Sequence, residues 1–221
     1  MSEASVDIPL YLRETYSWAY LTPWLAKILD RDWVVQSILW GNAQKLIDAA
    51  LAEVRPGDRT LQPAAVYGDF SCQLAAKSGH LTVRDVAPLQ LSHTRRKLPA
   101  KAPVRLQRHD ATQLSDDRFD AVVCFFLLHE VPDAEKRQIV QTLLRQLASG
   151  GRAVFVDYHE PHRLHPLGPL MRLIYRLFEP FATGMWRAEI REMAGDVAQQ
   201  YRWSKSVRFG GLYQIVVAEA N

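Results

Sequence analysis

The chain has 221 residues, of which 48% are hydrophobic and 23% charged, and this composition predicts one globular domain with a sizeable core. It excludes disordered, collagen-like and low-complexity proteins. The longest apolar run, 121–128, is far shorter than the ~20 residues that cross a bilayer, and residues 1–7 lack the pattern of an export signal. With 27 basic and 24 acidic residues, the charge balance does not favour nucleic acid as a partner.

The two cysteines, Cys72 and Cys124, lie far apart without a CxxC motif, so we expect free thiols and a cytoplasmic protein. Positive charge gathers between Arg84 and Arg108, where seven Lys or Arg accompany one acid. This segment is either a solvated surface or a docking patch for an anionic surface.

Residues 9–54 read as N-terminal helices, with a break at Thr22-Pro23. Half of the chain's Trp and Tyr residues fall within the first forty positions: Tyr11, Tyr16, Trp18, Tyr20, Trp24, Trp33 and Trp40. They either pack in a core or wall a channel for a flat ring and an isoprenoid tail.

Apolar and helical segments then alternate, which predicts a Rossmann-like, doubly wound and mostly parallel α/β sheet. We expect strands at 60–66, 81–85, 104–107, 120–126 and 152–157, and helices at 71–77, 88–98 and 133–147. The runs 206–209 and 213–218, separated by Gly210-Gly211, predict a C-terminal antiparallel hairpin at the sheet edge. The expected single domain, 1–221, thus comprises the N-terminal helices, a core at 60–157, a lid insertion at 158–200 and the hairpin at 206–218.

Ligands of such a sheet bind beyond the carboxyl ends of the strands. Gly68 follows the first strand, where a glycine allows close backbone approach to a ligand. Asp85 ends the second strand, where a carboxylate accepts from ribose hydroxyls, and Asp110 follows the third, where it can accept from an adenine amino group. Capping of the next helix by Asp85, and of a loop by Asp110, are the structural alternatives.

The candidates for catalysis follow the fourth and fifth strands. His129 and Glu130, with Asp157, Tyr158 and His159, can supply a base, an acid and ligands for a divalent metal. Alternatively, His129 caps the next helix and Glu130 pairs with a cation.

Two further patterns leave alternatives open. The spacing of His159, His162 and His165 resembles that of metal ligands on a helix, but prolines interrupt that helix. Residues 169–178 are apolar nearly all round, with Arg172 and Arg176 on one side, so they form either a lid helix or a helix lying in a membrane surface.

Several ordered blocks resemble those of class I S-adenosylmethionine (SAM) dependent methyltransferases, most closely the quinone-biosynthesis C-methyltransferases. These blocks are LQPAAVYGDFS at 61–71, DVAP at 85–88, Asp110-Ala111, FDAVV at 119–123, LLHEVP at 127–132 and LASGGR at 147–152. Within this superfamily, the aromatic N-terminus and VDYHEPHRLHPL at 156–167 resemble the methyltransferase-like rhodoquinone-biosynthesis family, whose members convert ubiquinone to rhodoquinone.

The resemblance implies a set of site residues. SAM would bind at Gln62, Tyr67, Gly68, Asp69, Asp85, Val86, Asp110, Ala111 and Phe126. Catalysis would use Asp157, Tyr158, His129 and His159, and Asp157 with His129 would hold a divalent metal, manganese by resemblance.

The chain departs from the superfamily pattern at the first strand. Gln62 stands where an acid usually holds the ammonium of SAM, and Ala64 and Val66 replace two glycines. This implies either an altered cofactor pose or lost SAM binding. Because an adjacent negative charge stabilises an ammonium, its absence makes the free, nucleophilic amine easier to form.

The function expected from the resemblance is rhodoquinone formation, a metal-assisted, SAM-dependent amino transfer that replaces a ring methoxy group of ubiquinone. The alternatives are a SAM-dependent methyltransferase of a quinone or another lipophilic ring, and a non-catalytic lipid-binding accessory protein. We expect the protein at the inner face of the membrane as a peripheral protein, and the sequence leaves its oligomeric state open.

Overall fold

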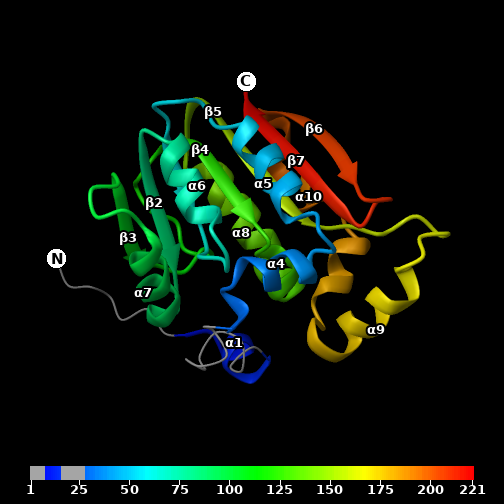
Figure 1. Ribbon diagram of the computed structural model, residues 1–221. Helices are drawn as coiled ribbons and strands as arrows, with labels where there is room; N and C mark the ends of the chain where they lie inside the picture. Colours follow the sequence, from blue (N-terminus) through cyan, green and yellow to red (C-terminus); the bar gives the residue numbers. More distant parts are fainter. Residues whose placement is uncertain (1–7, 16–27) are drawn as a thin grey trace.

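A central seven-stranded sheet organises the computed structural model, which describes residues 8–15 and 28–221 (Figure 1). The strands are β1 (Arg59–Gln62), β2 (His80–Asp85), β3 (Val104–Arg108), β4 (Phe119–Phe125), β5 (Leu147–Tyr158), β6 (Tyr201–Arg208) and β7 (Tyr213–Ala220). Their order is β3-β2-β1-β4-β5-β7-β6. Strands β1 to β5 are parallel, and β7 pairs antiparallel with both β5 and β6, so the predicted sheet and its C-terminal hairpin are confirmed.

The strand order reverses between β1 and β4, because β2 and β3 lie on one side of β1 and β5 lies beyond β4. A crevice forms outside the carboxyl ends of the strands at such a point. The fold therefore places the ends of β1, β2, β4 and β5 around a common space.

Helices cover both faces of the sheet (Figure 1). The helices of the described residues are α1 (Leu10–Thr15), α4 (Asp32–Ile38), α5 (Ala43–Ala52), α6 (Phe70–Lys77), α7 (Pro88–Lys97), α8 (Asp133–Arg145), α9 (Gly168–Phe178) and α10 (Ile190–Met193), with short 3-10 helices at Leu128–Glu130, Ala182–Trp186 and Gly195–Gln200. The predicted helix break at Thr22-Pro23 and the aromatic residues Tyr16, Trp18, Tyr20 and Trp24 lie outside the described residues.

Strand β4 lies within the longest apolar run of the chain, 121–128, except for its first two residues, and its packing explains this run. Ala121, Val123 and Phe125 pack into the core on the α5 and α6 side, whereas Val122 and Cys124 pack on the α8 side. Successive side chains of a strand point to opposite faces, so a strand covered on both faces needs apolar residues throughout. Both cysteines are free thiols, as expected.

Several predicted boundaries were wrong. The first strand ends at Gln62 rather than at residue 66, because Pro63 has no N–H to donate to a neighbouring strand. Strand β5 begins at Leu147 rather than at 152, and its pairing with β4 is irregular between Phe119 and Ala121. The first hairpin strand begins at Tyr201 rather than at 206.

The segment between β5 and β6 contains α9, whose Met171 and Tyr175 are buried while Leu173 and Leu177 are exposed. Figure 1 shows α9 set apart from the helices that cover the sheet. No helix in the described part of the chain is both long and apolar enough to span a bilayer. The division into one domain with a lid at 158–200 stays a prediction.

Candidate functional site

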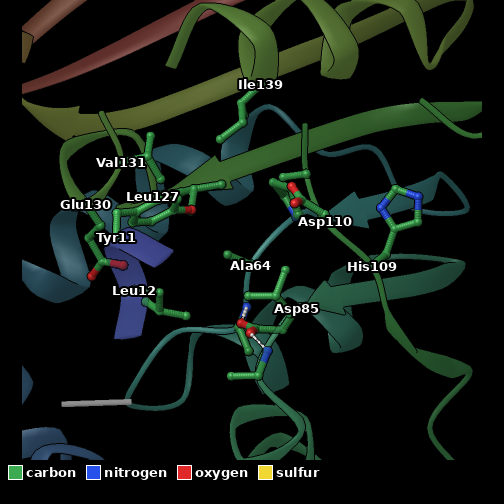
Figure 2. Close-up of a pocket in the computed structure, with 15 residues that line it drawn as sticks. Tyr11, Leu12, Ala64, Asp85, His109, Asp110, Leu127, Glu130, Val131 and Ile139 are labelled. Carbon is green, nitrogen blue, oxygen red and sulfur yellow. Dashed lines mark hydrogen bonds between the residues drawn. The ribbon is translucent and has the colours of Figure 1, made fainter. Parts of the chain in front are cut away.

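Two neighbouring pockets open at the carboxyl ends of the strands. The first, the Asp85 pocket, has a volume of about 550 Å³ including its open mouth and is shown in Figure 2. Asp85 and Asp110 lie on one side of it in this view, and Tyr11, Leu12 and Glu130 lie on the other. Its remaining lining residues are Pro63, Ala64, Ala65, Val86, Ala87, His109, Ala111, Leu127, Val131 and Ile139.

Asp85 connects two loops at the floor of this pocket. Its Oδ2 accepts a hydrogen bond from Ala65 N at 2.9 Å, and its Oδ1 accepts one from Ala87 N at 2.7 Å. Burial raises the pKa of the Asp85 carboxyl to about 7, against the effect of these backbone donors. The carboxylate thus closes the turn after β1 and supports the start of α7, and it also faces the pocket.

Asp110 both orders its own loop and lines the same pocket. Its Oδ1 accepts hydrogen bonds from the backbone N–H of Thr112 at 2.8 Å and from the Thr112 hydroxyl at 2.7 Å. The loop-capping interpretation is therefore correct in geometry. The predicted residues Asp85, Val86, Asp110 and Ala111 come together in one pocket.

The second pocket, the Tyr158 pocket, has a volume of about 760 Å³ including its opening. Aliphatic and aromatic side chains form most of its wall: Leu29, Val35, Ile38, Leu39, Val66, Tyr67, Phe125, Phe126 and Tyr158. Its polar residues are His129, Glu130 and Glu179. Glu130 lines both pockets, so they meet at this residue.

His129 is held in the wall of this pocket by Asp157. The Nδ1 atom of its imidazole donates to Oδ1 of Asp157 at 2.9 Å, while its Nε2 lies 3.8 Å from Glu130 Oε1 and 4.0 Å from Glu179 Oε2. Burial lowers the pKa of His129, but the neighbouring carboxylates, Asp157 above all, outweigh it and raise the pKa to about 9. The ring is therefore charged near neutral pH. The alternative helix-capping role of His129 is wrong, because Pro132 occupies the N-cap of α8.

Both oxygens of Asp157 are engaged within the protein. Besides the imidazole, Oδ1 accepts from Tyr158 N at 2.7 Å, and Oδ2 accepts from Leu128 N at 2.9 Å and His129 N at 3.3 Å. This arrangement makes Asp157 a residue that positions His129, rather than a base or metal ligand open to the pocket. Among residues 8–15 and 28–221, no group of three or more His, Cys, Asp or Glu side chains has the geometry to hold a metal ion.

Tyr158 stands at the centre of an aromatic cluster. Its ring centroid lies 4.7 Å from that of His129, 5.3 Å from Phe126 and 5.0 Å from Tyr175. Phe126 itself has a φ of +50°, an uncommon backbone conformation for a residue with a side chain. The end of β4 thus turns sharply and brings Phe126 beside Tyr158 in the pocket wall.

The turn after β1 places Tyr67, Gly68 and Asp69 away from the Asp85 pocket. Gly68 has a φ of +80°, and its N–H donates to Asp30 Oδ1 at 3.0 Å. The Tyr67 hydroxyl accepts from Gln90 at 3.0 Å, and Asp69 accepts from Gln73 at 2.8 Å. Tyr67 lines the Tyr158 pocket, and all three residues line a smaller pocket next to α4.

Gln62 is fully buried at the end of β1. Its Nε2 donates to Ala64 O at 2.8 Å, while its Oε1 has no hydrogen-bond partner among the described residues. The side chain therefore turns back on the loop that follows it. An unpaired buried oxygen is costly. The predicted cofactor residue Gln62 lines neither the Asp85 pocket nor the Tyr158 pocket.

The predicted histidine spacing does not produce one site. His159 Nδ1 lies 2.8 Å from Gly211 O, whereas the Nδ1 atoms of His162 and His165 accept from the backbone N–H groups of Leu164 and Leu167. Each ring serves a separate local contact because the chain here is a loop rather than a helix. His159 is thereby tied to the turn between β6 and β7.

Sequence reasoning missed Glu179, Tyr11 and Ala64 as pocket residues. Glu179 follows α9 and lies 50 positions from His129, and no motif connects the two. Tyr11 belongs to the aromatic N-terminus, whose composition stood out in the sequence but did not indicate which of its residues line a pocket. Ala64 stands within the block at 61–71 that carries the methyltransferase resemblance.

The comparisons with known proteins agree with this arrangement. Residues 61–151 match a family model described as a methyltransferase domain. The chain has the class I methyltransferase fold. The magnesium protoporphyrin IX methyltransferase of Synechocystis, solved with bound SAM, superposes with a TM-score of 0.66 at 17% identity, and the match covers 100% of both chains.

Curated relatives include quinone-modifying methyltransferases. A demethylmenaquinone methyltransferase of Clavibacter sepedonicus is 37% identical over 142 residues, which are 62% of this chain and 55% of the relative. A 2-phytyl-1,4-naphtoquinone methyltransferase of Synechococcus elongatus is 30% identical over 158 residues, 68% of this chain and 60% of the relative. The matched regions thus span little more than half the length of these relatives.

Proposed function

We propose that this chain is a SAM-dependent methyltransferase that acts on a quinone or another lipophilic ring. The observation that carries the proposal is the meeting at Glu130 of the Asp85 pocket and the largely apolar Tyr158 pocket. The names of the curated relatives support a quinone as the substrate class.

The Asp85 pocket fits SAM. Asp85 can accept from ribose hydroxyls and Asp110 from the adenine amino group, and the side chains of Leu127, Val131 and Ile139 offer an apolar wall to the adenine ring. When bound, SAM would supply a methyl group: a bond would form between the ring nucleophile and the methyl carbon, the electron pair of the S–CH₃ bond would stay on sulfur, and the ring would lose one proton.

The Tyr158 pocket fits a flat ring that carries oxygen atoms. Phe126 and Tyr158 provide aromatic edges and faces for the ring. The charged His129 can donate from Nε2 to a ring oxygen, which favours the ionised and more nucleophilic form of a hydroquinone. Glu130 and Glu179 lie within 4.0 Å of His129 Nε2. They are the nearest carboxylates to this nitrogen that could accept the proton lost by the substrate ring.

The test is to incubate the protein with SAM and a reduced naphthoquinone that lacks the ring methyl group. Formation of S-adenosylhomocysteine and a methylated ring, read by mass spectrometry, supports the proposal. SAM binding without methylation of any quinone, benzenoid or naphthoquinone, contradicts it. The absence of both binding and product favours the accessory-protein alternative.

Amino transfer to ubiquinone is a second candidate, and Gln62 is the observation that favours it. The neutral side chain contributes no carboxylate at the end of β1 to stabilise an ammonium, and its buried Oε1 has no hydrogen-bond partner in the part of the chain that the structure describes. A free amine could then form a bond to the ring carbon while the methoxy group leaves as methanol, and the amino group would stay on the ring once its bond to the α-carbon of the cofactor breaks. Manganese belongs to this candidate, but because both oxygens of Asp157 are engaged, we derive no step through a metal.

Gln62→Glu separates the two candidates, because it changes the charge and keeps the length of the side chain. If amine chemistry operates, the new carboxylate should retain SAM binding yet reduce aminated quinone several-fold. The assay contains SAM, ubiquinone and manganese, with a parallel reaction without manganese, and mass spectrometry distinguishes aminated from methylated rings. Equal amination by variant and parent removes the electrostatic argument for Gln62.

A further inference from the structure

Helix α9 presents one buried and one exposed apolar face. On the inner face, Met171 and Tyr175 are 2% and 0% exposed. On the outer face, Leu170, Leu173 and Leu177 are 41%, 54% and 62% exposed. The spacing of three and four residues places these leucines on one side of the helix.

The exposed apolar surface continues beyond the helix. Leu164 in the preceding loop is 86% exposed, and Phe178 at the helix end is 53% exposed. Phe209, exposed at the turn between β6 and β7, has its ring centroid 5.2 Å from that of His165, next to Leu164. We call the set Leu164, Leu170, Leu173, Leu177, Phe178 and Phe209 the α9 face.

Positive charges outnumber negative ones around the α9 face, where Glu160 and Glu179 flank a stretch with three arginines. The chain from 161 to 178 contains no Asp or Glu, whereas Arg163, Arg172 and Arg176 in this stretch are exposed. Arg208, also exposed, adds a positive charge next to Phe209. An apolar helix face accompanied by arginine is typical of helices that lie in the headgroup region of anionic bilayers.

We propose that the α9 face docks on an anionic phospholipid bilayer, with α9 lying in the plane of the surface. The leucines insert at the boundary between headgroups and acyl chains, while the arginines contact phosphate groups. Because the bilayer's negative charge is opposite to that of the arginines, an anionic bilayer is favoured over a neutral apolar protein surface as the binding partner of the α9 face. The binding requires neither SAM nor a quinone, so it stands independently of the proposed reaction.

Docking in this orientation brings the bilayer close to the Tyr158 pocket. The Tyr175 ring on the inner face of α9 lies 5.0 Å from the ring of Tyr158. Glu179, directly after α9, lines the same pocket. A lipid-soluble ring that leaves the bilayer at α9 therefore has a short path to the pocket.

The experiment measures flotation of the purified protein with vesicles of mixed phosphatidylcholine and phosphatidylglycerol, without SAM or substrate. Leu173→Asp with Leu177→Asp should weaken binding by about tenfold or more. The matched control is Leu114→Asp, which alters a leucine of similar exposure, 56%, in the loop between β3 and β4, and it should bind as the parent does. Arg163→Glu with Arg176→Glu should weaken binding and reduce its dependence on salt.

Several outcomes overturn the proposal. These are parent protein that does not float with anionic vesicles, equal loss in the Leu114→Asp control, and unchanged binding by the double leucine variant. Light scattering tests whether a second copy of the chain covers the α9 face instead. If the parent forms a dimer that the double leucine variant does not form, and the parent does not bind vesicles, the bilayer proposal is rejected. Retained SAM binding and an unchanged melting temperature show that the variants remain folded, so failed docking is distinct from a failed methyltransferase assignment.

Discussion

His129 and Asp157 form a buried pair at the ends of β4 and β5, joined by a hydrogen bond of 2.9 Å from the imidazole Nδ1 to the carboxylate Oδ1. The remaining hydrogen bonds to Asp157 come from backbone N–H groups of Leu128, His129 and Tyr158. The Asp157 carboxylate is the main cause that raises the pKa of the His129 imidazole to about 9. The pair therefore orients His129 Nε2 toward the Tyr158 pocket.

Asp157→Asn should destabilise the protein and reduce turnover without weakening SAM binding. The amide keeps one acceptor oxygen but directs an NH₂ group toward backbone donors, so we expect a loss of about 1–3 kcal/mol in the free energy of unfolding. Urea unfolding measures the loss, and Asp196→Asn, a change at an exposed acid, is the control. Parental stability and turnover in Asp157→Asn would show that the carboxylate does not position His129.

The His129 pair also predicts how stability depends on pH. The pKa of His129 is about 9 in the folded protein, above the 6.5 usual for histidine, so protonation favours the folded state. This stabilisation is complete below pH ~6.5 and disappears as the pH rises through about 9. Unfolding free energies measured between these values should fall in the parent and fall less in His129→Gln, and equal slopes contradict the assignment.

Asp85 should control SAM affinity through its charge. Burial raises its pKa to about 7, so the ionised form that accepts from hydroxyl groups increases as the pH rises through that value. Calorimetry should show SAM affinity rising across pH 6–8 in the parent, with little pH dependence in Asp85→Asn. Asp85→Ala should weaken binding by about 1.5–3 kcal/mol, the scale of a lost charged partner.

The control for Asp85 is Asp196→Ala, because Asp196 is an exposed acid in the segment after α10. It should bind SAM as the parent does. Unchanged affinity in a folded Asp85→Ala protein would remove Asp85 from the cofactor site.

Tyr158→Phe should lower turnover by about 10- to 1000-fold at saturating SAM, because the hydroxyl is a polar group in an otherwise largely apolar pocket. The matched control is Tyr213→Phe, since Tyr213 stacks on Tyr158 with centroids 5.8 Å apart and its buried hydroxyl has no partner in the described part of the chain. Steady-state assays of both variants decide the matter. Similar losses in the two variants would indicate a packing effect rather than a role of the Tyr158 hydroxyl.

Local patterns in the sequence predicted most of the sheet. Short apolar runs alternating with helical segments correctly indicated parallel strands, and the glycines at 210 and 211 indicated the terminal hairpin. Strand ends were less well predicted, because a strand ends where its backbone no longer pairs with a neighbour. Strand β1 ends in this way before Pro63. Pairing between strands is a long-range property that a local pattern does not contain.

The sequence by itself determined that Asp85, Asp110, His129 and Asp157 lie at or just after the carboxyl ends of strands, and so at one edge of a parallel sheet, because that placement depends only on the strands being parallel. Only the tertiary structure decided what each group does there. The register of β4 against β5, with Phe125 opposite Val156, turns Asp157 toward His129 and away from solvent. The packing of Tyr175 on Tyr158 brings Glu179 to the pocket that His129, 50 positions earlier in the chain, also lines. Burial of aromatic surface, and not sequence spacing, sets where α9 lies.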